Sequence, residues 1–453
     1  MDGAVAVLDI GKTNVKLASF APDGALLWER ATPNRVLPGP PYPHADVEAI
    51  GAFLLAALAE ANRAAPVAAI VATTHGCAGA LIDESGLVLP VLDYEFAGVD
   101  EIEPAYAPLR PPFAESFSPK LPAGQNLGRQ LAWQKQRFPR EFARARHVLA
   151  YPQYWAWRLC GVAASEVTSL GSHSDLWAPR AGRPSRLVAA LGLEALMPPL
   201  APAWRRLGSV RPEIAAAAGL RAGVGVLCGV HDSNASLLPH LAARQPPFTI
   251  VSTGTWVILM AVGLGLDHLD PADDALANVD VEGRPVATAR FMGGREFAEI
   301  AGAPATPDEA ALARVVAAGA LALPCFSGQG GPFAAREGAI RGTVARADLP
   351  ALATLYCAGM TDLMLTRLGA AAGDLVIEGS LAANPAYGAL LAALRPGQGV
   401  YAATDAAGAA RGAALLAQWP AARVAPSARR IAPAAIGGLG GYREAWMQAV
   451  VGG

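Results

Sequence analysis

Charge, cysteine and long apolar runs are all scarce in this sequence, and each scarcity excludes a class of protein. Only 16% of the 453 residues are charged and 53% are apolar, which is too little charge for a disordered chain and enough apolar material for large cores. The net charge of −2 argues against a general nucleic-acid binder. The five cysteines have no paired spacing, so we expect neither a disulfide framework nor a zinc cluster.

The hydrophobicity pattern predicts no segment that would target the chain to a membrane. Gly, Pro or charged residues interrupt every apolar stretch before about 18 residues, the length that a membrane span requires. A strand is predicted almost from the first residue, without the basic region and apolar core of a signal peptide. We therefore expect a soluble cytoplasmic protein with no membrane partner. At roughly 150 residues per domain, its length allows two or three domains.

Helices and strands alternate along the chain, which predicts an α/β fold. In the first half we expect buried strands over 4–9 and 67–73, a returning strand over 15–20, a helix from Asp46 to Arg63, and a helical segment over 131–159. In the second half we expect helices over 348–371, 384–394 and 406–417 and strands over 374–377 and 399–402. A Gly/Thr turn between strands opens each half, which suggests a weak duplication into domains 1–240 and 241–453.

The turn Asp9-Ile10-Gly11-Lys12-Thr13-Asn14 directly follows the first buried strand. Backbone N–H groups in a tight glycine-containing turn form a concavity that binds anions, and the Thr13 hydroxyl adds a donor. Asp9 is suited to Mg2+, because hard cations prefer oxygen ligands. An ordinary hairpin turn without a ligand is the alternative, since short Gly/Thr motifs are weak signals. A similar turn, Ser252-Thr253-Gly254-Thr255, opens the second half.

Asp232 stands at a predicted junction between a strand and a helix. An aspartate at such a junction is usually an N-cap, worth roughly 1 kcal/mol. The functional interpretation makes Asp232 the base that accepts a hydroxyl proton during phosphoryl transfer. His231 either orients a substrate or packs in the core, and the packed role is favoured because histidine is intermediate in burial.

The segment Glu378 to Pro385 follows another predicted strand. Gly379 would let a flat ring approach the backbone. In the simpler interpretation the segment is a loop between a strand and a helix, with Asn384 as N-cap and Pro385 at the first helical position. The two interpretations are compatible.

In these motifs, and in their order, the chain resembles the FGGY carbohydrate kinases of the sugar kinase–actin–heat-shock ATPase superfamily. The resemblance implies two ribonuclease-H-like (actin-like ATPase) domains with a ligand cleft between them. It also implies that ATP and Mg2+ take part. The family's phosphate turn matches Asp9, Gly11 and Thr13, with Lys16 slightly displaced, and its central G-x-x-D segment matches Gly229 and Asp232.

By this resemblance, Asp232 is the catalytic base and Asp9 a metal ligand. The residues implied to bind ATP are Gly11, Lys12, Thr13, Asn14, Thr253, Gly254, Thr255, Gly379, Ser380 and Asn384. The segment around His75 is most similar to the fuculokinase and rhamnulokinase branch, which implies that the sugar contacts are His75, Gly76, Tyr94, Glu95, His231 and Asp232. Gln153, Glu166 and His173 are further candidates, although each alone is more readily a surface or satisfied polar residue.

Three departures from the family pattern affect the substrate and the nucleotide. The sugar-binding W-x-D-x-R stretch is not recognisable, and Leu92-Asp93-Tyr94-Glu95-Phe96 occupies its place. Glu378 stands where many members have the first Gly of a pair, and Gln329 replaces a Glu.

We expect an ATP-dependent kinase of a small ketose, such as an L-fuculose- or L-rhamnulose-like deoxyketose or a pentulose. The alternatives are a kinase of another polyol or of a tetrulose, or a catalytically silent regulator that binds sugar and ATP. The oligomeric state, a homodimer included, stays open.

Overall fold

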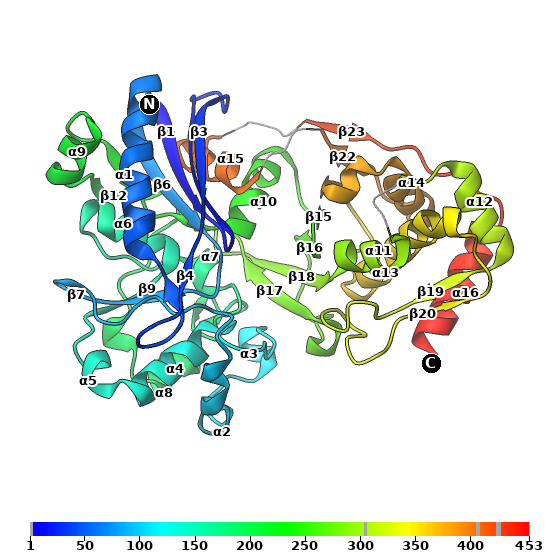
Figure 1. Ribbon diagram of the computed structural model, residues 1–453, viewed down its shortest axis with the longest axis horizontal. Helices are drawn as coiled ribbons and strands as arrows, with labels where there is room; N and C mark the ends of the chain where they lie inside the picture. The colour runs from blue at the N-terminus through cyan, green and yellow to red at the C-terminus, as the bar shows by residue number, and fades with distance from the viewer. Residues whose placement is uncertain (1–2, 303–305, 405–407, 423–426, 453) are drawn as a thin grey trace. The chain divides into compact units, whose positions relative to one another are not determined.

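The computed structural model describes residues 3–302, 306–404, 408–422 and 427–452 of the chain (Figure 1). The chain divides into two compact units. Unit 1 contains residues 1–243, 277–285 and 407–425, and unit 2 contains 244–276, 286–406 and 426–453. The chain therefore returns to unit 1 twice after it has first left it.

Unit 1 is built on a mixed sheet with the order β12-β13-β6-β1-β2-β3, in which β14 also pairs with β6. Its strands are β1 (Ala4–Ile10), β2 (Asn14–Phe20), β3 (Leu26–Pro33), β6 (Val67–Thr74), β12 (Arg206–Ser209), β13 (Gly225–Leu227) and β14 (Val230–His231). β1 and β14 both run parallel to β6, whereas β2 and β3 follow as antiparallel neighbours. This arrangement agrees with the predicted strands of the first half.

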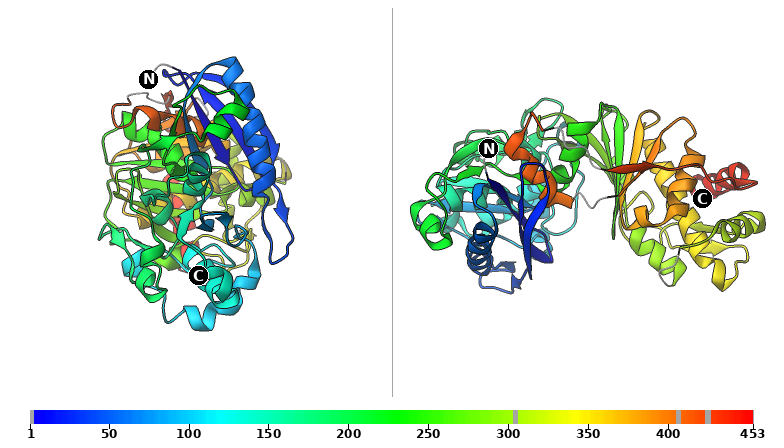
Figure 2. Two further views of the ribbon diagram at one scale, coloured as in Figure 1. Left: turned by 90° about the vertical axis from the view of Figure 1, so that its left-hand side faces the viewer. Right: turned by 90° about the horizontal axis from the view of Figure 1, so that it is seen from above.

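Helices cover both faces of this sheet (Figure 2) because successive side chains of a buried strand point to opposite faces. Leu8 and Ile10 of β1 pack in the cluster that includes α1 (Val47–Ala64) and α6 (Tyr151–Cys160). Val7 packs in the cluster that includes α10 (Asp232–Ala243) and α15 (Gly408–Leu415). The same alternation places Asp9 on the α10 face of the sheet.

Local sequence signals account for these helices. As predicted, Asp46 caps α1: its carboxylate accepts a hydrogen bond from the Ala49 N–H at 3.0 Å. α15 packs closely against α10, since a Cβ on Gly412 would lie 1.8 Å from the Ala235 carbonyl oxygen. The helix predicted over 406–417 corresponds to α15, and positions 406 and 407 lie outside the described residues.

The segment over 131–159 differs from the prediction of a helix with one break. A strand, β9 (His147–Ala150), separates α5 (Pro139–Phe142) from α6 and pairs with β7 (Gly79–Asp83). The other helices of unit 1 are α2 (Glu103–Tyr106), α3 (Phe113–Ser116), α4 (Leu127–Arg137), α5 (Pro139–Phe142), α7 (Val167–Leu170), α8 (Arg186–Ala190) and α9 (Pro212–Ala218). The remaining short strands are β4 (Val36–Leu37), β5 (His44–Ala45), β8 (Gly86–Leu87), β10 (Trp177–Ala178) and β11 (Arg183–Pro184).

Unit 2 is built on a second mixed sheet with the order β17-β18-β16-β15-β21-β22-β23. Its strands are β15 (Phe248–Thr253), β16 (Val257–Val262), β17 (Ala275–Val279), β18 (Pro285–Phe291), β21 (Asp374–Gly379), β22 (Val400–Ala403) and β23 (Ala428–Arg430), and β19 (Leu321–Leu323) pairs separately with β20 (Ala339–Arg341). β15 and β21 are parallel, and their register sets Thr253 beside Gly379. The second predicted turn and the predicted 378–385 loop are therefore neighbours.

The helices of unit 2 are α11 (Gly293–Ala301), α12 (Glu309–Ala318), α13 (Leu349–Arg367), α14 (Pro385–Leu394) and α16 (Leu439–Val451). α13 contacts both α11 and α14. The segment Arg346–Arg367, which contains α13, is long and apolar enough to cross a membrane, but 83% of its apolar window is buried inside the protein. Such burial is typical of a core helix.

Candidate active site

Asp9 and Asp232 lie at the ends of two strands that flank β6. β1 pairs Asp9 with Thr73 of β6, and β14 pairs His231 with Thr74. The carboxyl ends of parallel strands are where ligands bind in open α/β sheets. Since Asp9 faces α10, and α10 begins at Asp232, both carboxylates belong to the same side of this sheet.

The electrostatics of Asp9 reflect this placement. The pKa of Asp9 is raised from 3.8 to about 6, mainly by burial and also by the negative charge of Asp232, while Lys16 partly opposes the change. Two carboxylates that disfavour each other's charge are stabilised when a cation binds between or beside them. Among the described residues, no group of three or more His, Cys, Asp or Glu side chains is arranged to hold a metal ion by itself.

Asp232 makes hydrogen bonds that differ from those of an N-cap. An N-cap side chain accepts from the N–H two or three residues later, but Asp232 Oδ1 accepts from the next residue, Ser233 N, at 2.6 Å. Ser233 Oγ at 3.4 Å and His231 Nε2 at 3.2 Å also lie beside Oδ1. The Asp232 side chain remains 32% exposed. This arrangement favours a carboxylate that is available to a ligand over one that only caps the helix.

The first turn is closed by a hydrogen bond from the Gly11 N–H to the Asn14 carbonyl oxygen at 2.9 Å. Thr13 and Asn14 are exposed, and the Asn14 amide donates to Thr13 Oγ1 at 3.2 Å. The Lys12 side chain points away from the other residues of this turn. Its ammonium group bonds to Asp93, lies 3.1 Å from Glu95 Oε2, and sits 4.7 Å from the ring centre of Tyr94.

The candidate sugar-binding residues of unit 1 lie together around Lys12. The His75 ring contacts the Tyr94 ring edge-on at 5.2 Å, and its Nδ1 lies 2.8 Å from the Gly76 carbonyl oxygen. A Cβ on Gly76 would lie 2.7 Å from His231 Nε2, so Gly76 borders His231 directly. Burial lowers the pKa of His75 and of His231 and raises that of Tyr94. At neutral pH the two imidazoles are therefore uncharged.

Sequence reasoning missed several groups at this site. Nothing in the sequence links Lys12 to Asp93, because the two residues are 81 positions apart. Cys77 Sγ lies 3.3 Å from His173 Nδ1, and the His173 ring lies 6.4 Å from that of His231. His173 was a candidate from the sequence, whereas Cys77 was not. A backbone φ of +59° at Cys77 and +46° at His173 accompanies this contact.

In unit 2 the second turn and the 378–385 loop are locked together through Thr253. The Thr253 hydroxyl donates to the Glu378 carbonyl oxygen at 2.6 Å and accepts from the Leu381 N–H at 2.9 Å. Gly379 has φ +86°, and a Cβ there would lie 1.8 Å from the Thr253 carbonyl oxygen, so only glycine fits. Thr253 thus supports the loop, and the exposed part of the turn is Gly254 and Thr255.

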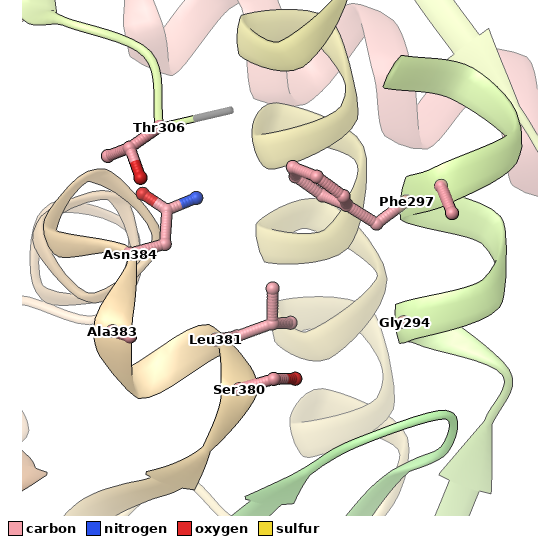
Figure 3. A pocket seen from close by; sticks show the side chains of 8 residues that line it. Gly294, Phe297, Thr306, Ser380, Leu381, Ala383 and Asn384 are labelled. Atoms are coloured by element: carbon pink, nitrogen blue, oxygen red, sulfur yellow. The ribbon is translucent and has the colours of Figure 1, made fainter. Parts of the chain in front are cut away.

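A cavity of about 500 Å³ opens beside this loop (Figure 3). Its lining residues are Gly294, Phe297, Ala298, Thr306, Ser380, Leu381, Ala383 and Asn384. Asn384 is the N-cap of α14, since its Oδ1 accepts from the Ala386 N–H at 3.1 Å, and Pro385 follows at the first helical position, as predicted. An apolar cavity with an aromatic ring and a few polar groups suits a flat heterocycle. No motif in the sequence marked Phe297 as part of a binding site.

Comparison with known proteins identifies relatives along most of the chain. Residues 123–239 match the model of the "FGGY family of carbohydrate kinases, N-terminal domain", and residues 245–426 match "Carbohydrate kinase FGGY, C-terminal domain". L-fuculokinase of Escherichia coli K12 is 26% identical over 275 residues, which cover 58% of this chain and 57% of that protein. The chain thus spans little more than half the length of the curated relatives it matches.

Solved structures are similar over nearly the whole chain. A carbohydrate kinase from Novosphingobium aromaticivorans is 36% identical, with a TM-score of 0.92 and 99% coverage of both chains. Xylulose kinase from Rhodospirillum rubrum is 18% identical, with a TM-score of 0.79 and 98% coverage of both, which shows a shared fold. The predicted α/β fold of the actin-like ATPase type is confirmed.

Proposed function

The chain belongs to the FGGY family of carbohydrate kinases, and we propose that it transfers the terminal phosphoryl group of ATP to a hydroxyl group of a small ketose in the cytoplasm. The observation that carries this proposal is the pair Asp9 and Asp232 at the ends of the two strands that flank β6, on the same face of one sheet. We assign sugar binding and the base to 1–240 and nucleotide binding mainly to 241–453.

Asp232 acts as the general base in this proposal. A sugar hydroxyl is a poor nucleophile, so its proton passes to the Asp232 carboxylate as its oxygen forms a bond to phosphorus and the bond from phosphorus to the leaving oxygen of ADP breaks. The exposed face of Asp232 supports this role, because a base must reach its substrate within a hydrogen bond. Positioning and charge neutralisation supply most of the rate enhancement in such transfers.

The residues present fit a magnesium ion. Mg2+ is usually held by one or two carboxylates together with waters and substrate phosphates, and Asp9 offers a partly buried carboxylate whose charge is disfavoured without a cation. When bound, Mg2+ neutralises charge on the phosphates. We therefore assign Asp9 to the metal, directly or through water.

Nucleotide binding divides between adenine and phosphate contacts. The cavity beside α11 offers the Phe297 ring for stacking, with Ser380 and Asn384 as polar neighbours, and we assign it to adenine. Gly254 and Thr255 are exposed at the second turn, and Gly11, Thr13 and Asn14 form the first, so both turns can present backbone N–H groups to phosphates. Lys12 pairs with Asp93 and Glu95, and these contacts favour a role in the sugar site, with the segment over 92–96, rather than with the phosphates.

The charge of the sugar-binding region favours a neutral sugar. Asp93, Glu95, Asp9 and Asp232 contribute four carboxylates, and Lys12 is the cation paired with two of them. His75 and His231 are uncharged, since burial lowers their pKa. A sugar acid would therefore meet net negative charge. The similarity to L-fuculokinase makes a deoxyketose the first substrate to test, with a pentulose next.

The experiment is ADP release measured with a panel of ketoses, polyols and sugar acids, followed by product analysis. We expect turnover with at least one neutral ketose and none with sugar acids of the same chain length. Turnover with a polyol or tetrulose alone would select the first alternative. Nucleotide and sugar binding without ADP release across the whole panel would select a silent regulator and refute the kinase proposal.

A further inference from the structure

His231 is buried beside Asp232 and has hydrogen-bond partners on both ring nitrogens. The residue is 3% exposed, and its Nε2 lies 3.2 Å from Asp232 Oδ1. On the other side of the ring, Nδ1 lies 3.2 Å from Ser172 Oγ and 3.3 Å from Asn234 Nδ2. A histidine that merely fills space in the core would not require this set of partners.

The chemistry of the partners selects one tautomer. A carboxylate only accepts, so Nε2 must carry the proton that is donated to Asp232 Oδ1. An amide nitrogen only donates, so Nδ1 accepts from Asn234 Nδ2. The Ser172 hydroxyl lies 2.6 Å from Asn278 Oδ1 and donates there. The neutral Nε2–H form satisfies the contacts with Asp232 and Asn234. The single Ser172 proton goes to Asn278, so Ser172 Oγ is a close neighbour of Nδ1 and donates no hydrogen bond to it.

The position of the ring is fixed from several directions. The backbone N–H of His231 donates to Thr168 Oγ1 at 3.1 Å, and the Thr168 hydroxyl donates to Glu166 Oε2 at 2.6 Å. Glu166 is fully buried and caps α7. Across the ring, the Cβ that Gly76 lacks would lie 2.7 Å from Nε2, so a larger residue there would displace the imidazole.

We propose that His231 is a positioning residue that holds Oδ1 of Asp232 and thereby presents Oδ2 to the sugar hydroxyl. In the described part of the chain, the hydrogen bonds to this carboxylate all go to Oδ1, from His231 Nε2, Ser233 N and Ser233 Oγ. Oδ2 is the oxygen left to take the proton. This inference rests on the proposed kinase function with Asp232 as base.

Two amide substitutions test the inference, because they place a donor at different ring positions. In His231→Gln the amide nitrogen reaches the place of Nε2, whereas in His231→Asn it reaches only the place of Nδ1. With the ketose that the panel identifies, we expect His231→Asn to lower kcat about 10- to 100-fold, as is typical when a supporting hydrogen bond is lost. His231→Gln should recover at least half of that loss on a logarithmic scale. The sugar KM should change less than about threefold in both variants.

A matched control is His147→Asn, the same substitution on β9 outside the candidate site, which should leave kcat unchanged. Equal kcat values for the Gln and Asn variants of His231, or a loss confined to KM, would overturn the positioning role. Asp232→Asn measured alongside separates the two claims. If Asp232→Asn turns over normally, the proposed function loses its base. If it is inactive while both His231 variants match the wild type, only the positioning inference fails.

A second measurement does not depend on the sugar. The 15N NMR spectrum of histidine-labelled protein distinguishes Nε2–H from Nδ1–H imidazole, and His231→Gln assigns the signal. We expect the neutral Nε2–H tautomer at neutral pH. A ring protonated on Nδ1 alone would contradict the donation to Asp232 and overturn the inference.

Discussion

Replacing Asp9 by Asn should stabilise the metal-free protein while it impairs catalysis. The carboxylate of Asp9 is partly buried near Asp232, and its pKa is raised from 3.8 to about 6. Since each pKa unit corresponds to about 1.36 kcal/mol, ionised Asp9 disfavours the folded state by about 3 kcal/mol as an upper limit. The uncharged amide of Asn removes this penalty.

The pH dependence of the effect has a definite sign. An acid whose folded-state pKa is raised binds protons more tightly when folded, so its penalty is complete above about pH 6 and vanishes below 3.8. The advantage of Asp9→Asn should therefore be largest near pH 8, at about 3 kcal/mol or less. It should fall to about half of its pH 8 value at pH 5.

The assay is urea unfolding of both proteins in EDTA at pH 8 and pH 5, repeated with magnesium and nucleotide at pH 8. Ligand at 100 times its Kd stabilises by about 2.7 kcal/mol, and this gain should be present in the wild type and reduced in the variant. If Asp9→Asn is less stable than the wild type at pH 8 in EDTA, the claim that ionised Asp9 lowers the free energy of unfolding of the metal-free protein is refuted.

Four further substitutions test the assigned contacts. Gly254→Val should raise the Kd for ATP about 100-fold by blocking the approach of the phosphates. Its stability should not change, because a Cβ on Gly254 meets nothing within 4 Å. Gly379→Ala should instead unfold more easily, because a Cβ there would lie 1.8 Å from the Thr253 carbonyl oxygen. Calorimetry and thermal melting distinguish the two effects, and unchanged ATP affinity for Gly254→Val would count against the second turn. Phe297→Ala should raise the Kd for ATP about tenfold by removing a stacking surface, measured by calorimetry; an equal effect on sugar binding would argue against an adenine cavity. Asp93→Ala should raise the sugar KM by releasing Lys12 while kcat changes little, and a loss confined to kcat would contradict this role.

The sequence predicted the elements whose signals are local. The buried strand before Asp9, the cap at Asp46 and the Asn384-Pro385 helix start each depend on a few adjacent residues, and the structure has all three. The strand β9 was missed because four residues of an apolar run cannot be told from a helix by periodicity alone.

The candidate site was predictable where a motif is continuous and not where distant segments meet. Asp232 and the two turns are visible in the sequence. The bond between Lys12 and Asp93 and the contacts of His231 with Ser172 and Asn234 depend on the tertiary fold. The preference for a packed His231 described its burial correctly and overlooked its contact with Asp232, because burial does not reveal which atom faces which.

The most direct test of the account compares ADP release by the wild type and Asp232→Asn, with the ketose that the panel identifies, while calorimetry follows nucleotide binding. Removing the proton acceptor should lower kcat by at least about 100-fold and leave the Kd for ATP within about threefold, since a general base contributes 10²- to 10⁴-fold. An Asp232→Asn variant that phosphorylates the sugar at the wild-type rate would contradict the assignment of Asp232 as the base.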